Sequence, residues 1–224
     1  MRRFSLFALM ISLTGPVAAQ TAPSASEVAA YDGLFRAAHE GDVAGIERLV
    51  AQGADVDARD RRGRTPVHVA AFASEDEALR ALAEAGANMN ALEHRAYDVV
   101  TIAAVANDPE LMSLAIELGN DPGLVTSPYL GTALIAAAHL GHVEVVRRLI
   151  AAGAPLDHIN NLNWTAVMES VVLGDGGPNH FAVLDALLSA GADRTLADSD
   201  GVTPLEHAES RGFAEMAKRL RRLD

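Results

Sequence analysis

The chain has 224 residues and a formal net charge of −12, with 18 Lys and Arg against 30 Asp and Glu. Such an acidic balance argues against broad binding to nucleic acids or anionic membrane surfaces, which require basic faces. The sequence contains no cysteine, which excludes disulfides, thiolate nucleophiles and cysteine metal ligands. A chain of this length can bury a sizeable core.

Residues 1–19 have the pattern of a secretory signal peptide. Two arginines precede a mostly apolar stretch, and Val17 and Ala19 occupy the small-residue positions of a cleavage site. The apolar run of about ten residues is too short to span a bilayer. The alternative, an uncleaved N-terminus that folds with the rest, is disfavoured because these residues carry no repeat pattern. We therefore expect cleavage after Ala19 and a periplasmic protein with no membrane span, or alternatively a secreted one.

Residues 20–31 form a linker that leads into the repeats. Ser24 and Glu27 have the spacing of a capping box, in which each side chain bonds to the backbone amide of the other residue. This spacing predicts a capping helix that begins near Ala25 and runs into the first repeat.

From residue 32 to residue 224, a short signal recurs about every 33 residues. A fixed period of this size indicates a solenoid of stacked units, none of which can bury its apolar face alone. Thr at the anchor position favours a helix N-cap, and Pro after it suits the first helical turn. A glycine 21 residues after the anchor, such as Gly53, ends the second helix in the left-handed conformation. The anchors are Asp32, Thr65, Asp98, Thr132, Thr165 and Thr203.

The units after the third anchor show both the pattern and its one large departure. Val143, Val146 and Leu149 recur at three- and four-residue spacing, which places them on one face of a second helix. The step from Thr165 to Thr203 is 38 residues instead of 33 or 34. We assign the five surplus residues to 174–178, a glycine-rich stretch interpreted as a flexible turn between two helices.

These units resemble ankyrin repeats, whose consensus reads TPLHxAA followed by GHxxVVxxLLxxGAD. The best match is residues 132–157, TALIAAAHLGHVEVVRRLIAAGAPLD, and the most degenerate unit begins at Asp98. The resemblance covers residues 32–224. It implies an all-α ankyrin-repeat solenoid of about six helix-turn-helix repeats with short β-hairpin fingers.

Signatures of catalysis are missing from the sequence: there is no nucleophile elbow, phosphate loop or His-Glu-x-x-His motif. His139 and His142 have a spacing that a metal pair could use, but no third ligand of suitable spacing is visible. The repeat register instead gives His68, His142 and His180 structural roles. Residues 198–201 resemble part of a calcium loop but lack its other ligands, so we interpret them as a finger turn. We expect no enzyme activity, cofactor or metal.

Ankyrin proteins bind partners through the fingers and the first-helix surface of the concave face, which implies a candidate site here. Arginines and aromatics dominate interface hot spots, so we expect those at the carried-over positions to contact a partner instead of the core. We interpret the arginines as a positive patch that complements an acidic surface on the partner. The finger residues are Arg61, Arg62, Arg64, His94, Arg95, Tyr97, Tyr129, Leu162 and Trp164, and the helix residues are Phe72, Val105 and Leu140.

The main hypothesis is a monomeric, non-catalytic protein interaction module that acts as an adaptor, scaffold or inhibitor. One alternative is a small-ligand-binding or catalytic protein that uses the same groove, with His94 beside Glu93 as the candidate acid and base. Another is an exported effector that acts on a host protein. The simplest alternative is that the aromatic side chains only coat a solvated row of loops.

Overall fold

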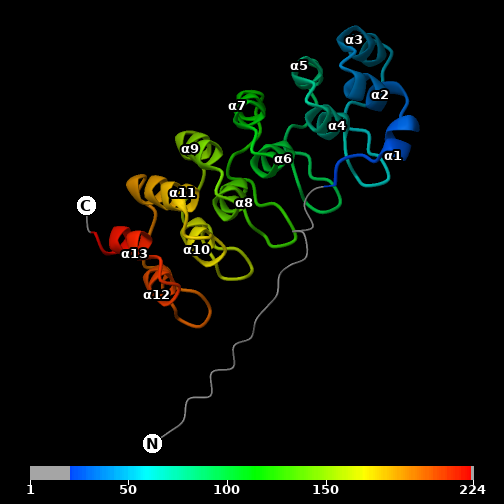
Figure 1. The fold of residues 1–224 in the computed structure, drawn as a ribbon. Helices are drawn as coiled ribbons and strands as arrows, with labels where there is room; N and C mark the ends of the chain where they lie inside the picture. The colour runs from blue at the N-terminus through cyan, green and yellow to red at the C-terminus, as the bar shows by residue number, and fades with distance from the viewer. Residues whose placement is uncertain (1–20, 223–224) are drawn as a thin grey trace, which may run out of the picture.

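The computed structural model describes residues 21–222, so the signal peptide predicted at residues 1–19 lies outside the described residues. Regular structure in the described part is helical, apart from an isolated antiparallel bridge between Thr126 and Gly131. Six helical hairpins stack side by side into an arc, preceded by the short helix α1 (Ala25–Ala29) (Figure 1). None of the described helices is long and apolar enough to cross a bilayer.

Each hairpin contributes one helix to the inner side of the arc and one to the outer side (Figure 1). The inner helices are α2 (Gly33–Glu40), α4 (Pro66–Ala73), α6 (Val99–Ala106), α8 (Ala133–Leu140), α10 (Ala166–Val172) and α12 (Pro204–Ser210). The outer helices are α3 (Val43–Ala51), α5 (Asp76–Glu84), α7 (Pro109–Glu117), α9 (Val143–Ala151), α11 (Pro178–Ser189) and α13 (Ala214–Arg221).

The six sequence anchors are the N-cap residues of the inner helices. The Oγ1 atoms of Thr132 and Thr165 accept the backbone N–H three residues later, and Asp98 does the same with a carboxylate oxygen. These bonds satisfy amides that have no partner within the helix. After the outer helix α3, Gly53 has a φ of +87°, which confirms the predicted left-handed end.

The capping box at Ser24 and Glu27 is present, with the Ser24 amide donating to a Glu27 carboxylate oxygen at 2.8 Å. The prediction that this helix runs into the first repeat is wrong, because α1 ends at Ala29 and α2 starts only at Gly33. Between them the side chain of Tyr31 is buried, and its ring stacks on Phe35 at a centroid distance of 5.5 Å. The buried ring therefore lies at the turn between the two helices.

The five surplus residues of the fifth unit do not all form a turn, contrary to the prediction. Helix α11 has 12 residues where α9 has nine, and the connection before it spans residues 173–177. His180 orders this connection, since its Nδ1 lies 2.8 Å from an Asp175 carboxylate oxygen and its Nε2 lies 2.9 Å from the His139 carbonyl. The insertion therefore lengthens the outer helix as well as the turn.

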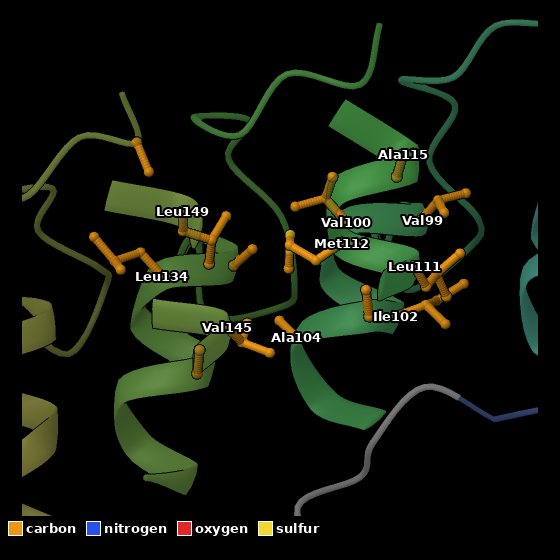
Figure 2. Packing of buried hydrophobic residues seen from close by; sticks show 14 of the residues in the cluster. Val99, Val100, Ile102, Ala104, Leu111, Met112, Ala115, Leu134, Val145 and Leu149 are labelled. Atoms are coloured by element: carbon orange, nitrogen blue, oxygen red, sulfur yellow. The ribbon is translucent and has the colours of Figure 1, made fainter. Parts of the chain in front are cut away.

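One apolar core runs through the whole stack, between the inner and outer helices and between neighbouring units. In the third and fourth units, Val100, Met112, Leu134 and Leu149 are almost completely buried (Figure 2). Burying one such side chain stabilises the fold by about 1.5–3 kcal/mol. Because each unit shares these contacts with its neighbours, the stack holds the finger loops on a common frame.

Candidate functional site

The loops between successive hairpins project from the inner side of the arc (Figure 1). We call them fingers and number each by the unit that it leads into. Each finger is closed by backbone hydrogen bonds; in finger 2, for example, the Asp60 amide donates to the Arg64 carbonyl at 2.9 Å. The fingers are finger 2 (58–65), finger 3 (91–98), finger 4 (124–132), finger 5 (158–165) and finger 6 (196–203).

Hydrogen bonds join neighbouring fingers into one continuous row. Three of these bonds are between backbone groups, and the fourth comes from a side-chain amide. The row therefore holds finger side chains in a fixed order along the inner side of the arc. The donor and acceptor pairs are His94 N to Arg62 O at 2.9 Å, Ser127 N to Ala96 O at 2.7 Å, Asn161 N to Tyr129 O at 2.9 Å, and Asn163 Nδ2 to Ala197 O at 3.2 Å.

Finger 4 has an unusual backbone. Two of its non-glycine residues, Ser127 and Leu130, adopt left-handed conformations with φ of +66° and +54°. A left-handed residue with a Cβ costs roughly 1–2 kcal/mol and persists only where its surroundings hold it. Here the Nε2 of His158, on finger 5, lies 2.7 Å from the Leu130 carbonyl oxygen. Backbone strain of this kind is concentrated at functional sites.

The exposed apolar side chains gather on fingers 4 and 5. Within residues 21–222, six large hydrophobic residues are exposed, and five lie on these two fingers. The sixth, Leu140, ends the inner helix α8. Neither residues 122–143 nor residues 158–168 contain Asp, Glu, Lys or Arg, and contiguous apolar surface is typical of interaction sites. We call the five the apolar finger patch: Val125, Tyr129, Leu130, Ile159 and Leu162.

Sequence reasoning identified part of this patch. Tyr129, Leu140 and Leu162 are exposed as expected. Val125, Leu130 and Ile159 were missed, although the 34-residue step into the fourth unit was a signal that its finger carries an extra residue. Among the other expected contact residues, three are exposed and four are partly buried. The exposed ones are Arg61, Arg62 and His94, and the partly buried ones are Phe72, Arg95, Val105 and Trp164.

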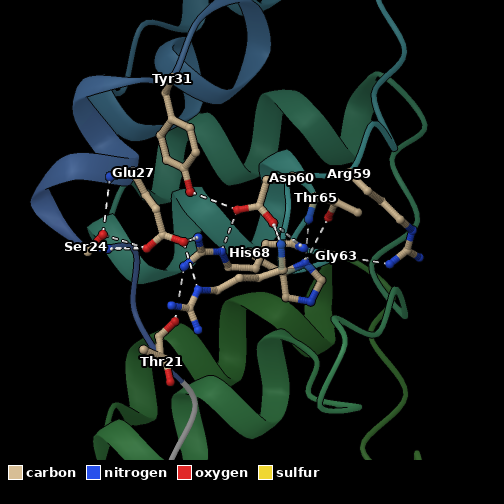
Figure 3. Close-up of polar contacts among 11 residues, drawn as sticks. Thr21, Ser24, Glu27, Tyr31, Arg59, Asp60, Gly63, Thr65 and His68 are labelled. Carbon is tan, nitrogen blue, oxygen red and sulfur yellow. Dashed lines mark hydrogen bonds and ion pairs between the residues drawn. The ribbon is translucent and has the colours of Figure 1, made fainter.

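Two of the expected contact residues are buried within the fold. Arg64 is 1% exposed and Tyr97 is 5% exposed, so the expectation that they lie on the binding surface is wrong. The Arg64 guanidinium lies 2.7 Å from a carboxylate oxygen of Asp60 and 2.8 Å from one of Glu27 (Figure 3). The side chain of Tyr97, on finger 3, is buried, and this burial raises the pKa of its phenol. The backbone carbonyl of Tyr97 bonds to the His68 ring at 3.1 Å.

The positive patch is narrower than the sequence indicated. Arg62 pairs with Glu27 at 2.8 Å, so the carboxylate of α1 neutralises part of finger 2 (Figure 3). Hydrogen bonds from the Ser24 amide and hydroxyl, together with Arg62, lower the Glu27 pKa to about 2. In residues 21–222, three finger arginines pair with no acid: Arg59, Arg61 and Arg95.

The histidines that the repeat register assigned to structure do have structural roles. His68 is fully buried, accepts the Thr65 N–H at Nδ1 and therefore donates from Nε2 to the Tyr97 carbonyl. Burial lowers the His68 pKa to about 4. His142 Nδ1 lies 2.8 Å from the Ala104 carbonyl of the preceding unit. These contacts link one unit to the next.

The two histidines considered as a metal pair have separate partners. His139 Nδ1 lies 3.1 Å from a carboxylate oxygen of the buried Glu169, whose other oxygen accepts from Asn160 at 3.0 Å, whereas His142 bonds to a backbone carbonyl. Asp198 closes finger 6 by accepting the Val202 N–H at 2.9 Å, as expected of a finger turn. No three His, Asp or Glu side chains within residues 21–222 are grouped to hold a metal ion.

The candidate acid and base, His94 and Glu93, are not paired with each other. A Glu93 carboxylate oxygen accepts the Arg95 N–H at 2.8 Å and the Tyr97 N–H at 3.3 Å. The His94 ring instead lies over Gly63, where a Cβ would meet its Cδ2 at 2.4 Å. A general base needs an orienting partner, and Glu93 does not orient this ring.

Comparisons with known proteins agree with this architecture. A family model that describes three consecutive ankyrin repeats matches this chain twice, at residues 24–96 and 100–198. A protein of Escherichia coli (strain K12) named YahD and described as an ankyrin repeat protein is 33% identical over 185 residues, or 82% of this chain and 92% of that protein. An ankyrin repeat domain from Acinetobacter baumannii superposes with a TM-score of 0.78 at 42% identity, covering 84% of this chain and 95% of that one.

A second solved structure shares the fold at lower identity. It is a complex of a predatory endopeptidase from Bdellovibrio bacteriovorus with an immunity protein. The matching chain has a TM-score of 0.70 at 23% identity and covers 87% of this chain and 99% of its own length. At this identity the likeness concerns the arrangement of the helices alone.

Proposed function

Because the chain belongs to the ankyrin repeat family, we propose that it is a non-catalytic adaptor, scaffold or inhibitor whose protein partner docks on the finger row. Ankyrin repeats are a protein–protein interaction fold. The observation that carries this proposal is the apolar finger patch, which exposes five large hydrophobic side chains on two hydrogen-bonded fingers. Its most exposed member is Leu130, which is 57% exposed.

The energetics of the patch favour a protein partner. Burying an exposed Leu side chain fully contributes roughly 1.5–3 kcal/mol, so Tyr129, Leu130 and Leu162 together could supply the hot spot of an interface. Hydrogen bonds between fingers hold these side chains before binding, which reduces the entropy lost on association. Both features are typical of a preformed docking surface.

The charges beside the patch favour a partner with acidic groups. Arg59, Arg61 and Arg95 lie on fingers 2 and 3 without an acid partner in residues 21–222. Carboxylates on the partner would speed association and disfavour wrong partners, chiefly at low ionic strength. We propose that the chain presents this surface as a monomer.

Site-specific crosslinking tests the proposal. A photoreactive residue in place of Leu162 should crosslink one discrete protein, whereas the same residue at Arg147 on the outer helix α9, where the side chain is 59% exposed, should not. The Leu130→Asp substitution should abolish the crosslink while leaving the circular dichroism spectrum unchanged. Equal crosslinking from both positions, or a crosslink that persists with Leu130→Asp, would remove the finger patch as the docking site.

We propose further that the mature protein is periplasmic, as the pattern of residues 1–19 supports. N-terminal sequencing of the protein from fractionated cells tests this. The expected result is a periplasmic chain that begins at Gln20. An intact N-terminus in the cytoplasmic fraction would contradict export, and recovery from the medium would favour the secreted alternative.

A further inference from the structure

We infer that the partner presents an elongated surface with an acidic end, an apolar centre and a basic end, and that its acidic end lies at finger 2. This inference rests on the proposed docking at the finger row. It adds a chemical class of partner and one direction of docking.

The row is long enough to contact all three parts of such a partner surface. Helices of neighbouring units pack about 8–10 Å apart, so the four steps from finger 2 to finger 6 span about 40 Å at most. An extended segment of about 12 residues covers that distance. Because hydrogen bonds join each finger to the next, the charges along the row keep their order.

The first end of the row is basic. Arg61 is exposed at finger 2, and Arg95 is partly exposed at finger 3. Arg59 bonds through Nη1 to the carbonyls of Gly63 and Leu92, at 2.8 Å and 2.6 Å, and pairs with no acid in residues 21–222. Of the acids at this end, Glu27 and Asp60 bind arginines, and the Glu93 carboxylate accepts the backbone amides of Arg95 and Tyr97.

The opposite end of the row is acidic. Residues 195–210, which form finger 6 and the inner helix α12, contain four acids and no Lys or Arg; one of the acids, Glu209, pairs with Arg221. Asp200 is exposed at the finger turn. Asp198 pairs with His207 at 2.7 Å, and bonds from that imidazole and from the Val202 and Asp200 amides outweigh burial and lower the Asp198 pKa. This end therefore keeps its negative charge at neutral pH.

The centre of the row disfavours charged groups on the partner. Fingers 4 and 5 carry the apolar finger patch, and residues 122–143 and 158–168 contain no Asp, Glu, Lys or Arg. A charged group buried there would lose its hydration without gaining a counter-charge, which is strongly unfavourable. A reversed partner would place like charges together at both ends. The row therefore selects one pattern and one direction.

Peptide probes test this order on the full chain. Two fluorescent peptides of about 14 residues share one composition: one has four acids at one end, an apolar centre and four lysines at the other, and the second alternates its charges. At low salt, the segregated peptide should bind at least about tenfold more tightly, and this advantage should shrink near 1 M salt, where the Debye length is about 3 Å. A spin label on its acidic end should broaden the NMR signals of Arg61 and Arg95, not that of Asp200.

Variants identify the cause of any preference. Arg61→Glu and Asp200→Lys should each reduce the preference for the segregated peptide several-fold, whereas Arg147→Glu on α9, an equal change of charge, should leave it unchanged. Equal affinity for the two peptides, or broadening of Asp200 by the acidic-end label, would overturn the inferred order.

An uncharged apolar peptide separates this failure from failure of the docking site. If it binds and Leu130→Asp abolishes that binding, the proposed site stands without the charge order. If Leu130→Asp changes the binding of none of the peptides, the proposed docking site is wrong. Self-association that Leu130→Asp abolishes, seen by analytical ultracentrifugation without peptide, would identify a second copy as the occupant and overturn the inference.

Discussion

The imidazole of His158 holds Leu130 in its exposed position. Its Nε2 atom lies 2.7 Å from the Leu130 carbonyl oxygen, and Leu130 has the largest exposed fraction among the large hydrophobic residues in the described chain. The fifth unit therefore supports the backbone of the fourth unit's finger. This contact connects the stacking of the units to the geometry of the proposed docking surface.

Replacing His158 should loosen finger 4 without unfolding the stack. We expect His158→Ala to cost about 1 kcal/mol, the net value of one hydrogen bond, and to speed hydrogen exchange at the Leu130 amide, which donates to the Ser127 carbonyl at 3.1 Å. His158→Gln, which keeps a donor, should restore part of the protection. Unchanged exchange in the Ala variant would show that the finger holds itself.

Asp98 and Asn120 should depend on each other for stability. Asn120 Nδ2 donates to an Asp98 carboxylate oxygen at 2.8 Å, and both residues are buried. The fourth unit, by contrast, carries Thr132 at the first position and Ala154 at the second. Asp98→Thr and Asn120→Ala should each destabilise the fold, since each leaves a buried polar group with fewer partners.

The double variant should be more stable than the sum of the single effects, with a coupling of about 1–2 kcal/mol. Urea denaturation of the four proteins at pH 7 measures this coupling. Additive effects would show that Asp98 and Asn120 act independently.

Burial also raises the Asp98 pKa, so the contribution of this carboxyl to stability should grow as the pH falls.

His68 should make the fold sensitive to mild acid. Burial lowers its pKa from 6.5 to about 4, so the folded state binds this proton less readily than the unfolded state. Its stabilising contribution is complete above pH 6.5 and is lost as the pH falls towards 4, by up to about 3 kcal/mol. Denaturation at pH 7 and 4.5 should show a smaller loss for His68→Gln than for the wild type. Equal losses would contradict this role.

Arg64 and Arg61 should differ sharply although they lie three residues apart. Arg64→Ala removes a buried cation from Asp60 and Glu27, and we expect a loss of about 3 kcal/mol. Arg61→Ala changes an exposed side chain and should alter stability by less than about 0.5 kcal/mol. Calorimetry of both variants tests the contrast. Similar melting temperatures would mean that the buried ion pairs contribute no net stability.

The periodicity predicted the fold well because local physics repeats in every unit. An N-cap such as Thr132, a glycine such as Gly53 and a helical apolar face each act within one hairpin. Structural roles for His68 and His142 followed from the same register. The surplus in the fifth unit was located between the right helices but assigned wholly to the turn, because glycines within 174–178 indicate a break without showing how far α11 extends.

The candidate site was predicted less completely, since it depends on contacts between distant residues. The positions before the anchors hold Arg64, Tyr97 and Trp164, and only the folded chain shows that the first two are buried. Arg64 meets Glu27, a residue 37 positions earlier, and no local pattern connects them. The exposure of Leu130 follows from an extra residue in finger 4 and a donor on finger 5.

The short helix α1 covers the N-terminal edge of the finger row. None of its residues is buried, and Glu27 holds it against finger 2 through Arg62 and Arg64. A solenoid whose final unit kept an open finger edge would invite another chain to continue the row. Here a solvent-exposed, charge-paired segment occupies that edge, so we expect the N-terminal end of the row to resist end-to-end growth into a filament.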